Sequence, residues 1–120
     1  MFRRGKYEQA EPLLREALEI RRRHRGDRDP ETATFLINWS TMVLHSRHDA
    51  ASAEALMREA LAIQRKFYGN DHPEVVDTLN RLSRILKSRN DMTGSEECTR
   101  ESEAISSRLR TVSQTKGRAG

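Results

Sequence analysis

Several residue types are scarce in this 120-residue chain, and each scarcity argues against a class of protein. The single cysteine, Cys98, cannot form an internal disulfide, which argues against a disulfide-stapled secreted domain. No apolar run approaches the ~20 residues that cross a bilayer, and the first residues lack the apolar stretch of a secretory signal. These absences predict a cytoplasmic protein that does not enter a membrane.

Glycine (6 residues), proline (3) and aromatic side chains (5%) are also few, and hydrophobic residues make up only 35% of the chain. A single compact core of this length usually needs more apolar side chains. A thin stack of helices, each of which buries one stripe, needs fewer. Alanine, leucine, glutamate and arginine dominate the sequence, and all four favour helices. The composition therefore predicts an all-helical chain.

Charge of one sign is not in large excess, because 22 lysines and arginines face 18 aspartates and glutamates. The two signs are interleaved, apart from one basic run at residues 21–25. A nucleic-acid-binding protein usually gathers a larger imbalance on one face. We therefore expect the basic run to complement the negative end of a helix dipole, with an anionic partner as the alternative.

The most informative feature is an internal repeat. The segment 10–22 aligns with the segment 53–65, and most positions carry the same residue in both. The same spacing of 43 residues relates Gly26 to Gly69 and Pro30 to Pro73. A third, more divergent copy begins at Ser95.

Within each copy, apolar residues recur three and four positions apart, as on one face of a helix. Pro30 and Pro73 stand where a helix tolerates proline, in its first turn. Gly26 and Gly69 stand where the preceding helix must end. The pattern predicts a disordered polar tail at 111–120. It predicts five helices, at about 6–24, 30–46, 50–67, 73–89 and 92–110.

Two segments carry a specific resemblance to a known family. Gly5–Arg21 resembles the second helix of a kinesin-light-chain-type tetratricopeptide repeat, and Gly69–Ser83 resembles the loop and first helix of that repeat. The resemblance implies an all-α fold in which antiparallel helix pairs stack as a right-handed α-solenoid. The domain would span residues 1–110, with an orphan second helix at 6–24 followed by helix pairs at 30–67 and 73–110.

The chain departs from the family pattern at its two ends. In the last copy, Thr99 and Ser102 replace core residues, which suits a capping helix with a wet outer face. At the other end, the helix at 6–24 has no first helix before it and would leave an apolar edge open. We expect that the chain is a fragment or the end of a longer array, or that it self-associates through this edge.

Residues able to carry out catalysis or bind a cofactor do not form a recognisable pattern. His45 and His48 have a spacing that could place two imidazoles on a metal, but no third ligand accompanies them, and we expect solvated histidines in a turn. Cys98 lacks the partners of a nucleophile and is expected to pack as a small apolar residue. Trp39 is expected in the core, with ligand stacking as the alternative. We predict no enzyme activity, no metal and no cofactor.

The resemblance also implies a function, the binding of a protein or peptide in a concave groove lined by the first helix of each pair. On this basis the candidate peptide-binding residues are Thr34, Asn38, Thr41, Asp77, Asn80, Arg81 and Arg84, with Ile37, His45 and Ser88 beside them. Arg81 and Arg84 would make part of the groove cationic. An acidic or C-terminal carboxylate segment could dock there, because arginine pairs carboxylates bidentately. The alternative is that these residues are ordinary solvated charges.

Two other functions stay open from the sequence. One is a nucleic-acid-binding helical repeat that uses residues 21–25 together with Lys116 and Arg118, although nucleic acid is not the favoured partner. The other is a regulatory or interaction segment of a larger signalling enzyme. The repeats by themselves do not identify the partner, because the same fold serves many unrelated proteins.

Overall fold

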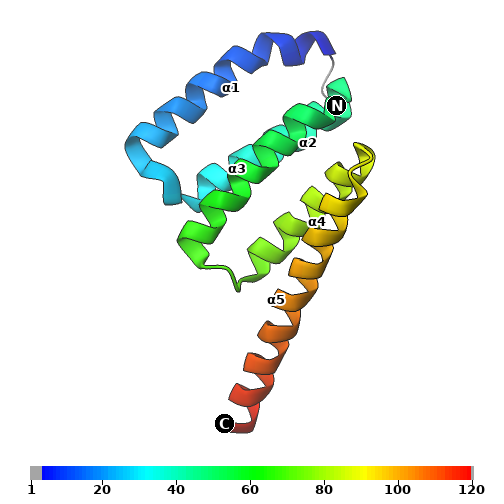
Figure 1. Cartoon of the computed structure of the whole chain (residues 1–120). Coiled ribbons are helices and arrows are strands. Elements are labelled where there is room, and N and C mark those ends of the chain that lie inside the picture. Colours follow the sequence, from blue (N-terminus) through cyan, green and yellow to red (C-terminus); the bar gives the residue numbers. More distant parts are fainter. Residues whose placement is uncertain (1–3, 120) are drawn as a thin grey trace.

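The computed structural model describes residues 4–119, and it describes the side chains of residues 7–112. The described chain forms five α-helices, as the sequence predicts (Figure 1). A short 3-10 turn, η1, spans Gly26–Arg28. The helices are α1 (Arg4–Arg25), α2 (Pro30–Arg47), α3 (Ala50–Tyr68), α4 (Pro73–Ser88) and α5 (Met92–Ala119).

The helices pack in the order in which they follow one another along the chain. Helices α2 and α3 form one pair and α4 and α5 a second, while α3 also packs against α4 and α1 against α2. The short turns between consecutive helices make neighbours antiparallel. The result is an elongated body of 55 × 37 × 23 Å, and the C-terminal part of α5 extends beyond the other helices (Figure 1). This is an all-α solenoid of helix pairs.

The repeated proline and glycine positions act as the sequence predicts. Pro30 and Pro73 each begin a helix, directly after a residue whose side chain caps it. Asp29 accepts a hydrogen bond from the backbone N–H of Glu31, and His72 accepts one through Nδ1 from the second residue of α4. Gly26 and Gly69 both adopt positive φ, at 77° and 83°, which a side chain would disfavour. Both repeats thus enter their first helix after a glycine of positive φ and through a side-chain N-cap, which is a carboxylate in one repeat and an imidazole in the other.

The start of α3 depends on Asp49, which gives a test of the capping geometry. The Asp49 carboxylate accepts hydrogen bonds from the Ser52 hydroxyl (2.7 Å) and the Ser52 backbone N–H (3.1 Å). The hydroxyl bond is the larger cause, followed by the backbone bond, and together they hold the pKa of Asp49 below its usual range.

We expect Asp49→Ala to lower the free energy of unfolding at pH 7 by about 1 kcal/mol, because α3 loses its N-cap. Asp49→Asn keeps an acceptor and serves as the control, with a smaller loss. Since the folded pKa is lowered, the charge-dependent part of the stabilisation is present at neutral pH. This part of the stabilisation is lost as the pH falls below about 4 and then through the pKa of Asp49 in the folded protein. Urea denaturation of the three proteins between pH 7 and pH 3 measures both effects; equal stability of Asp49→Ala and wild type would refute the capping role.

The core follows the repeat and divides into two linked clusters. One lies between α3, α4 and α5, and the other between α1, α2 and α3. A buried serine in each first helix donates its hydroxyl to a backbone carbonyl of the second helix. Ser40 bonds to the carbonyl of Ala53 at 2.7 Å, and Ser83 bonds to that of Ser95 at 3.0 Å. These equivalent contacts hold each pair at close range, as small residues at these positions allow.

The predicted helix bounds lie within two residues of the structure except at the end of α5, and two of the differences change where side chains lie. Helix α2 continues to Arg47, so His45 lies in its last turn, and the αL residue His48 (φ 54°) ends it. Helix α5 continues to Ala119, where the sequence predicts a disordered tail from residue 111; residue 120 lies outside the described residues. Nothing between residues 106 and 119 stops a helix strongly, since the segment lacks proline and a lone glycine costs only about 1 kcal/mol.

Among the described residues, none of the helices is long and apolar enough to cross a membrane.

Candidate functional site

Two adjoining hollows, of about 240 and 390 Å³, lie between α2 and α4. Because both are lined by Leu44, His45 and Arg84, they form one continuous surface, which we call the α2–α4 groove. The first hollow is lined by Ser40, Thr41, Leu44, His45, Met57, Arg81, Arg84 and Ile85. The second is lined by Leu44, His45, His48, Ala50, Arg84 and Ser88.

The groove exists because α2 and α4 both pack on α3, which separates the two first helices. Met57 of α3, together with Leu44 and Ile85 on the two walls, gives the groove an apolar lining. Met57 and Ile85 belong to the buried core, so the floor and the α4 wall of the groove are rigidly supported. Apolar contacts can therefore add to any polar recognition by the rim.

The rim of the groove is cationic. Arg81 and Arg84 lie one turn apart on α4, and both line the same hollow. Arg81 donates to the carboxylate of Asp77 (Nε to Oδ2 3.2 Å), whereas Arg84 forms no ion pair within the described part of the chain. None of the described residues that line the two hollows is acidic. An exposed guanidinium beside apolar floor residues suits a ligand that carries a carboxylate.

The structure brings together three of the seven predicted groove residues, Thr41, Arg81 and Arg84. Asp77 lies at the margin through its contact with Arg81. Thr34 and Asn38 are exposed on the earlier turns of α2 and do not line either hollow. Of the residues expected beside them, His45 and Ser88 line the groove as well.

Asn80 does not have the predicted orientation. Its side-chain oxygen accepts a hydrogen bond of 2.7 Å from the Ser102 hydroxyl of α5, so it serves the α4–α5 pair. The reason is its place on the helix: Asn80 lies three residues before Ser83, which bonds to the backbone of α5. Residues three apart share a helix face, and this face is turned toward α5.

Sequence reasoning missed six residues of the groove, and two of them, Ser40 and Ala50, are small residues at its margins. Leu44, Met57 and Ile85 form its apolar lining, and His48 lies at its end. A signal was present for one of them, because Leu44 stands where the next copy of the repeat has a lysine. A residue that is apolar in one copy of the repeat and polar in the other indicates a role of that copy alone, such as lining a groove. The two core residues carry no such signal.

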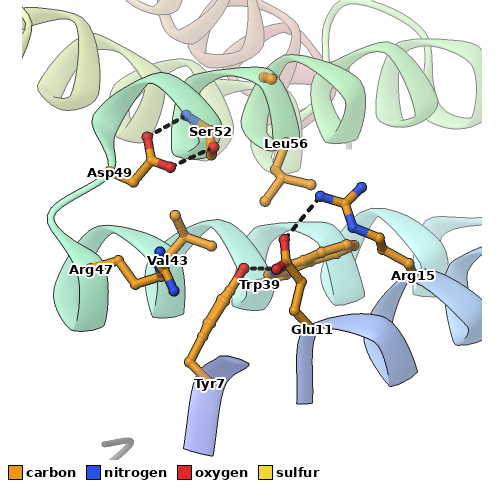
Figure 2. Close-up of a pocket in the computed structure, with 10 residues that line it drawn as sticks. Tyr7, Glu11, Arg15, Trp39, Val43, Arg47, Asp49, Ser52 and Leu56 are labelled. Atoms are coloured by element: carbon orange, nitrogen blue, oxygen red, sulfur yellow. Dashed lines mark hydrogen bonds and ion pairs between the residues drawn. The ribbon is translucent and has the colours of Figure 1, made fainter. Parts of the chain in front are cut away.

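A third hollow, of about 240 Å³, lies between α1, α2 and α3 (Figure 2). At its base the indole N–H of Trp39 donates to the Tyr7 hydroxyl at 2.9 Å. Trp39 is only 3% exposed, which confirms the predicted core position. The charged groups here are already engaged: Arg15 pairs with Glu11, and Asp49 caps α3 (Figure 2). The charges that line this hollow are balanced, and the Trp39 N–H is already hydrogen-bonded to Tyr7. This hollow therefore offers less to a charged ligand than the α2–α4 groove.

The basic run at residues 21–25 is largely neutralised within the chain. Arg25 lies 3.4 Å from the carboxylate of Glu31 and Arg21 lies 3.7 Å from it, while Arg22 pairs with Glu59 of α3. Nucleic-acid binding depends on free lysine and arginine side chains that neutralise phosphates, so that the nucleic acid releases its counterions. These ion pairs disfavour a nucleic-acid role for the run. Lys116 and Arg118 lie outside the side chains that the structure describes.

The remaining reactive side chains are placed as packing residues or cap residues. Cys98 is buried in the cluster between α3, α4 and α5, and burial raises the pKa of its thiol, which lowers the fraction of reactive thiolate. His45 and His48 line the groove beside Arg84, where a positive guanidinium disfavours a metal cation. Within the described residues, no group of three or more histidine, cysteine, aspartate or glutamate side chains could hold a metal ion.

Comparison with known proteins agrees with this geometry. The sequence of residues 41–108 matches the tetratricopeptide repeat family, and residues 1–31 match it too. The chain belongs to the tetratricopeptide repeat family. Its fold is similar to the crystal structure of BtubC (BKLC) from P. vanneervenii, with a TM-score of 0.74 and 24% identity over 88% of the chain. The chain spans 42% of the length of that protein. No curated protein matches the chain.

These findings confirm the kinesin-light-chain-type tetratricopeptide repeats that the sequence predicts. Tetratricopeptide repeats generally mediate contacts between proteins, and the family is typically a non-catalytic scaffold.

Proposed function

We propose that this tetratricopeptide repeat chain is a non-catalytic scaffold that binds an acidic or C-terminal carboxylate segment of a partner protein in the α2–α4 groove. The observation that carries the proposal is the pairing of Arg81 and Arg84 over an apolar floor, with no acidic residue among the described groove residues. Arg84 is exposed and available, and Arg81 can exchange its solvated contact with Asp77 for a ligand carboxylate.

The groove also explains how specificity can arise. Leu44, Met57 and Ile85 offer contacts to an apolar side chain of the ligand, while the arginines fix its carboxylates. Thr41 already donates its hydroxyl to the carbonyl of Ile37, which leaves the hydroxyl oxygen as an acceptor facing the hollow. A ligand with an aliphatic residue close to one or two carboxylates fits this arrangement best.

The test is a titration with two sets of labelled ten-residue peptides, rich in aspartate and glutamate, with free or amidated C-termini. We expect the double variant Arg81→Ala/Arg84→Ala to bind selected peptides at least about tenfold more weakly, because it loses charge-assisted hydrogen bonds. The matched control Arg100→Ala/Arg110→Ala removes the same charge from exposed positions on α5 and should bind like wild type.

Unchanged binding by the groove variant, or equal loss in both double variants, would refute a specific role of the groove. Comparison of free and amidated peptides tells whether a terminal carboxylate or acidic side chains are read. Titration against duplex DNA at several salt concentrations tests the nucleic-acid alternative. A nucleic-acid-binding protein would show a steep loss of affinity with salt.

A further inference from the structure

One face of α1 carries an apolar stripe that the described structure leaves largely open. Its members are spaced three and four residues apart, so they lie along one side of the helix. Leu13 is 66% exposed and Ile20 is 48% exposed, while the two alanines between and beside them are half-buried. We call this set the α1 stripe; it consists of Ala10, Leu13, Ala17 and Ile20.

The repeat shows what such a stripe contacts when it is covered. The positions 43 residues later carry the same four residue types, and they are Ala53, Leu56, Ala60 and Ile63 of α3. There both alanines are 0% exposed and the isoleucine is 6% exposed. The covering element is α2, because the Ser40 hydroxyl bonds to the Ala53 carbonyl and the alanine and isoleucine at 60 and 63 share one core cluster with residues of α2. The same set of side chains is buried in α3, apart from the half-buried Leu56, and largely open in α1.

The second apolar face of α1 is already in use. Leu18 is buried and Leu14 packs against the cluster between α1, α2 and α3. The equivalent residues of α3, Met57 and Leu61, pack in the same way toward α4. Helix α1 therefore carries the two apolar faces that α3 also carries. Only the face that packs toward α2 and α3 is covered, and the α1 stripe is not.

We propose that the α1 stripe is a docking site for an amphipathic helix with the chemistry of α2, antiparallel to α1. The alanines let such a helix approach closely, while Leu13 and Ile20 fill the space between its side chains. A hydroxyl at the position of Ser40 would donate to the carbonyl of Ala10, as Ser40 does to Ala53. The docked helix would extend the existing cluster of α1, α2 and α3 without a break.

A second copy of the chain is a poorer occupant. Its own α2 and α4 faces are occupied by α3 and α5. Its α1 stripe, which is open, consists only of alanine, leucine and isoleucine and offers no hydroxyl donor. Because the stripe lies on α1 and lines neither hollow of the α2–α4 groove, this inference is independent of the proposed function.

The α2 sequence itself is the probe, since it already fits the identical stripe of α3. A fluorescent peptide of residues 29–47 is titrated with the full chain and followed by anisotropy. We expect Leu13→Glu and Ile20→Glu each to weaken binding at least about tenfold, because each places a charge in the apolar contact. Phe67→Glu, which changes a 54% exposed apolar residue of α3, should leave binding unchanged. A peptide with Ser40→Val should bind about fivefold more weakly.

An isolated 19-residue peptide has low helicity in water, which weakens its binding, so a second measurement ties the peptide to the chain. Residues 29–47 are joined ahead of Met1 by a flexible Gly/Ser linker, which raises their effective concentration to the millimolar range. We expect the melting temperature to rise by about 4–8 °C, and Leu13→Glu in the same fusion to abolish the rise. Circular dichroism confirms that each variant is folded.

Two results would overturn the proposal. In the first, wild type and Leu13→Glu bind the peptide equally and the fusion melts at the temperature of the unfused chain. In the second, light scattering shows a dimer that Leu13→Glu dissociates and that the α2 peptide does not disrupt. The stripe would then contact another copy of the chain.

Discussion

Replacing Leu79 by alanine is expected to lower the free energy of unfolding by about 2–5 kcal/mol. Leu79 is 1% exposed and lies in the cluster that joins α3, α4 and α5. The substitution removes apolar contacts and leaves a cavity that neighbouring helices cannot close without shifting. A domain of this size has a total stability of about 5–15 kcal/mol, so the loss is a large share. Urea denaturation followed by circular dichroism measures it.

Leu13→Ala is the matched control, because it makes the same chemical change at a side chain that is 66% exposed. We expect it to change the free energy of unfolding by less than about 0.5 kcal/mol. Similar losses for the two variants would contradict the burial that separates them. Such a result would mean that the α1 stripe is covered in solution.

Replacing Ala60 by leucine is expected to cost about 1–3 kcal/mol of unfolding free energy, because α2 and α3 leave no room for extra methylenes. Ala60 is 0% exposed and belongs to the cluster that joins these helices. Its equivalent one repeat earlier, Ala17, lies on the open stripe of α1 and is half-buried. Ala17→Leu should therefore cost much less.

Thermal denaturation of these two variants tests both the close packing of α2 on α3 and the absence of a covering helix on the α1 stripe. A loss at Ala17 as large as that at Ala60 would mean that a helix already covers α1. Equal tolerance of leucine at both positions would contradict the close packing of α2 on α3. Either outcome would remove the structural basis of the docking proposal.

The helices were predictable because their signals are local. Pro30 and Pro73 mark first turns, Gly26 and Gly69 end helices at positive φ, and apolar residues recur with the helical period. The repeat added the order in which neighbours pack. The errors lie where local signals are weak: α5 runs past residue 110 because no residue there stops it, and α2 takes in His45 before the αL turn at His48.

The candidate site was predictable only in part. The family resemblance selected α2 and α4 as the walls of the groove, and Thr41, Arg81 and Arg84 do line it together. Asn80 was assigned to the same surface although a hydrogen bond to Ser102 directs it to α5. Which of two adjacent faces a polar residue serves depends on the partner that reaches it, and that partner is 22 residues away in the chain.

Periodicity and the internal repeat were enough to specify five helices, their pairing and the family, because each rests on residues close together in sequence or on a register shared by its copies. Only the packed chain decided the rest. It joined Trp39 to Tyr7 across 32 residues, used the acids of Glu31 and Glu59 to neutralise a basic run, and left one stripe of α1 open whose copy in α3 is buried. Burial is a property of neighbours, so identical side chains acquire different roles once helices do or do not lie against them.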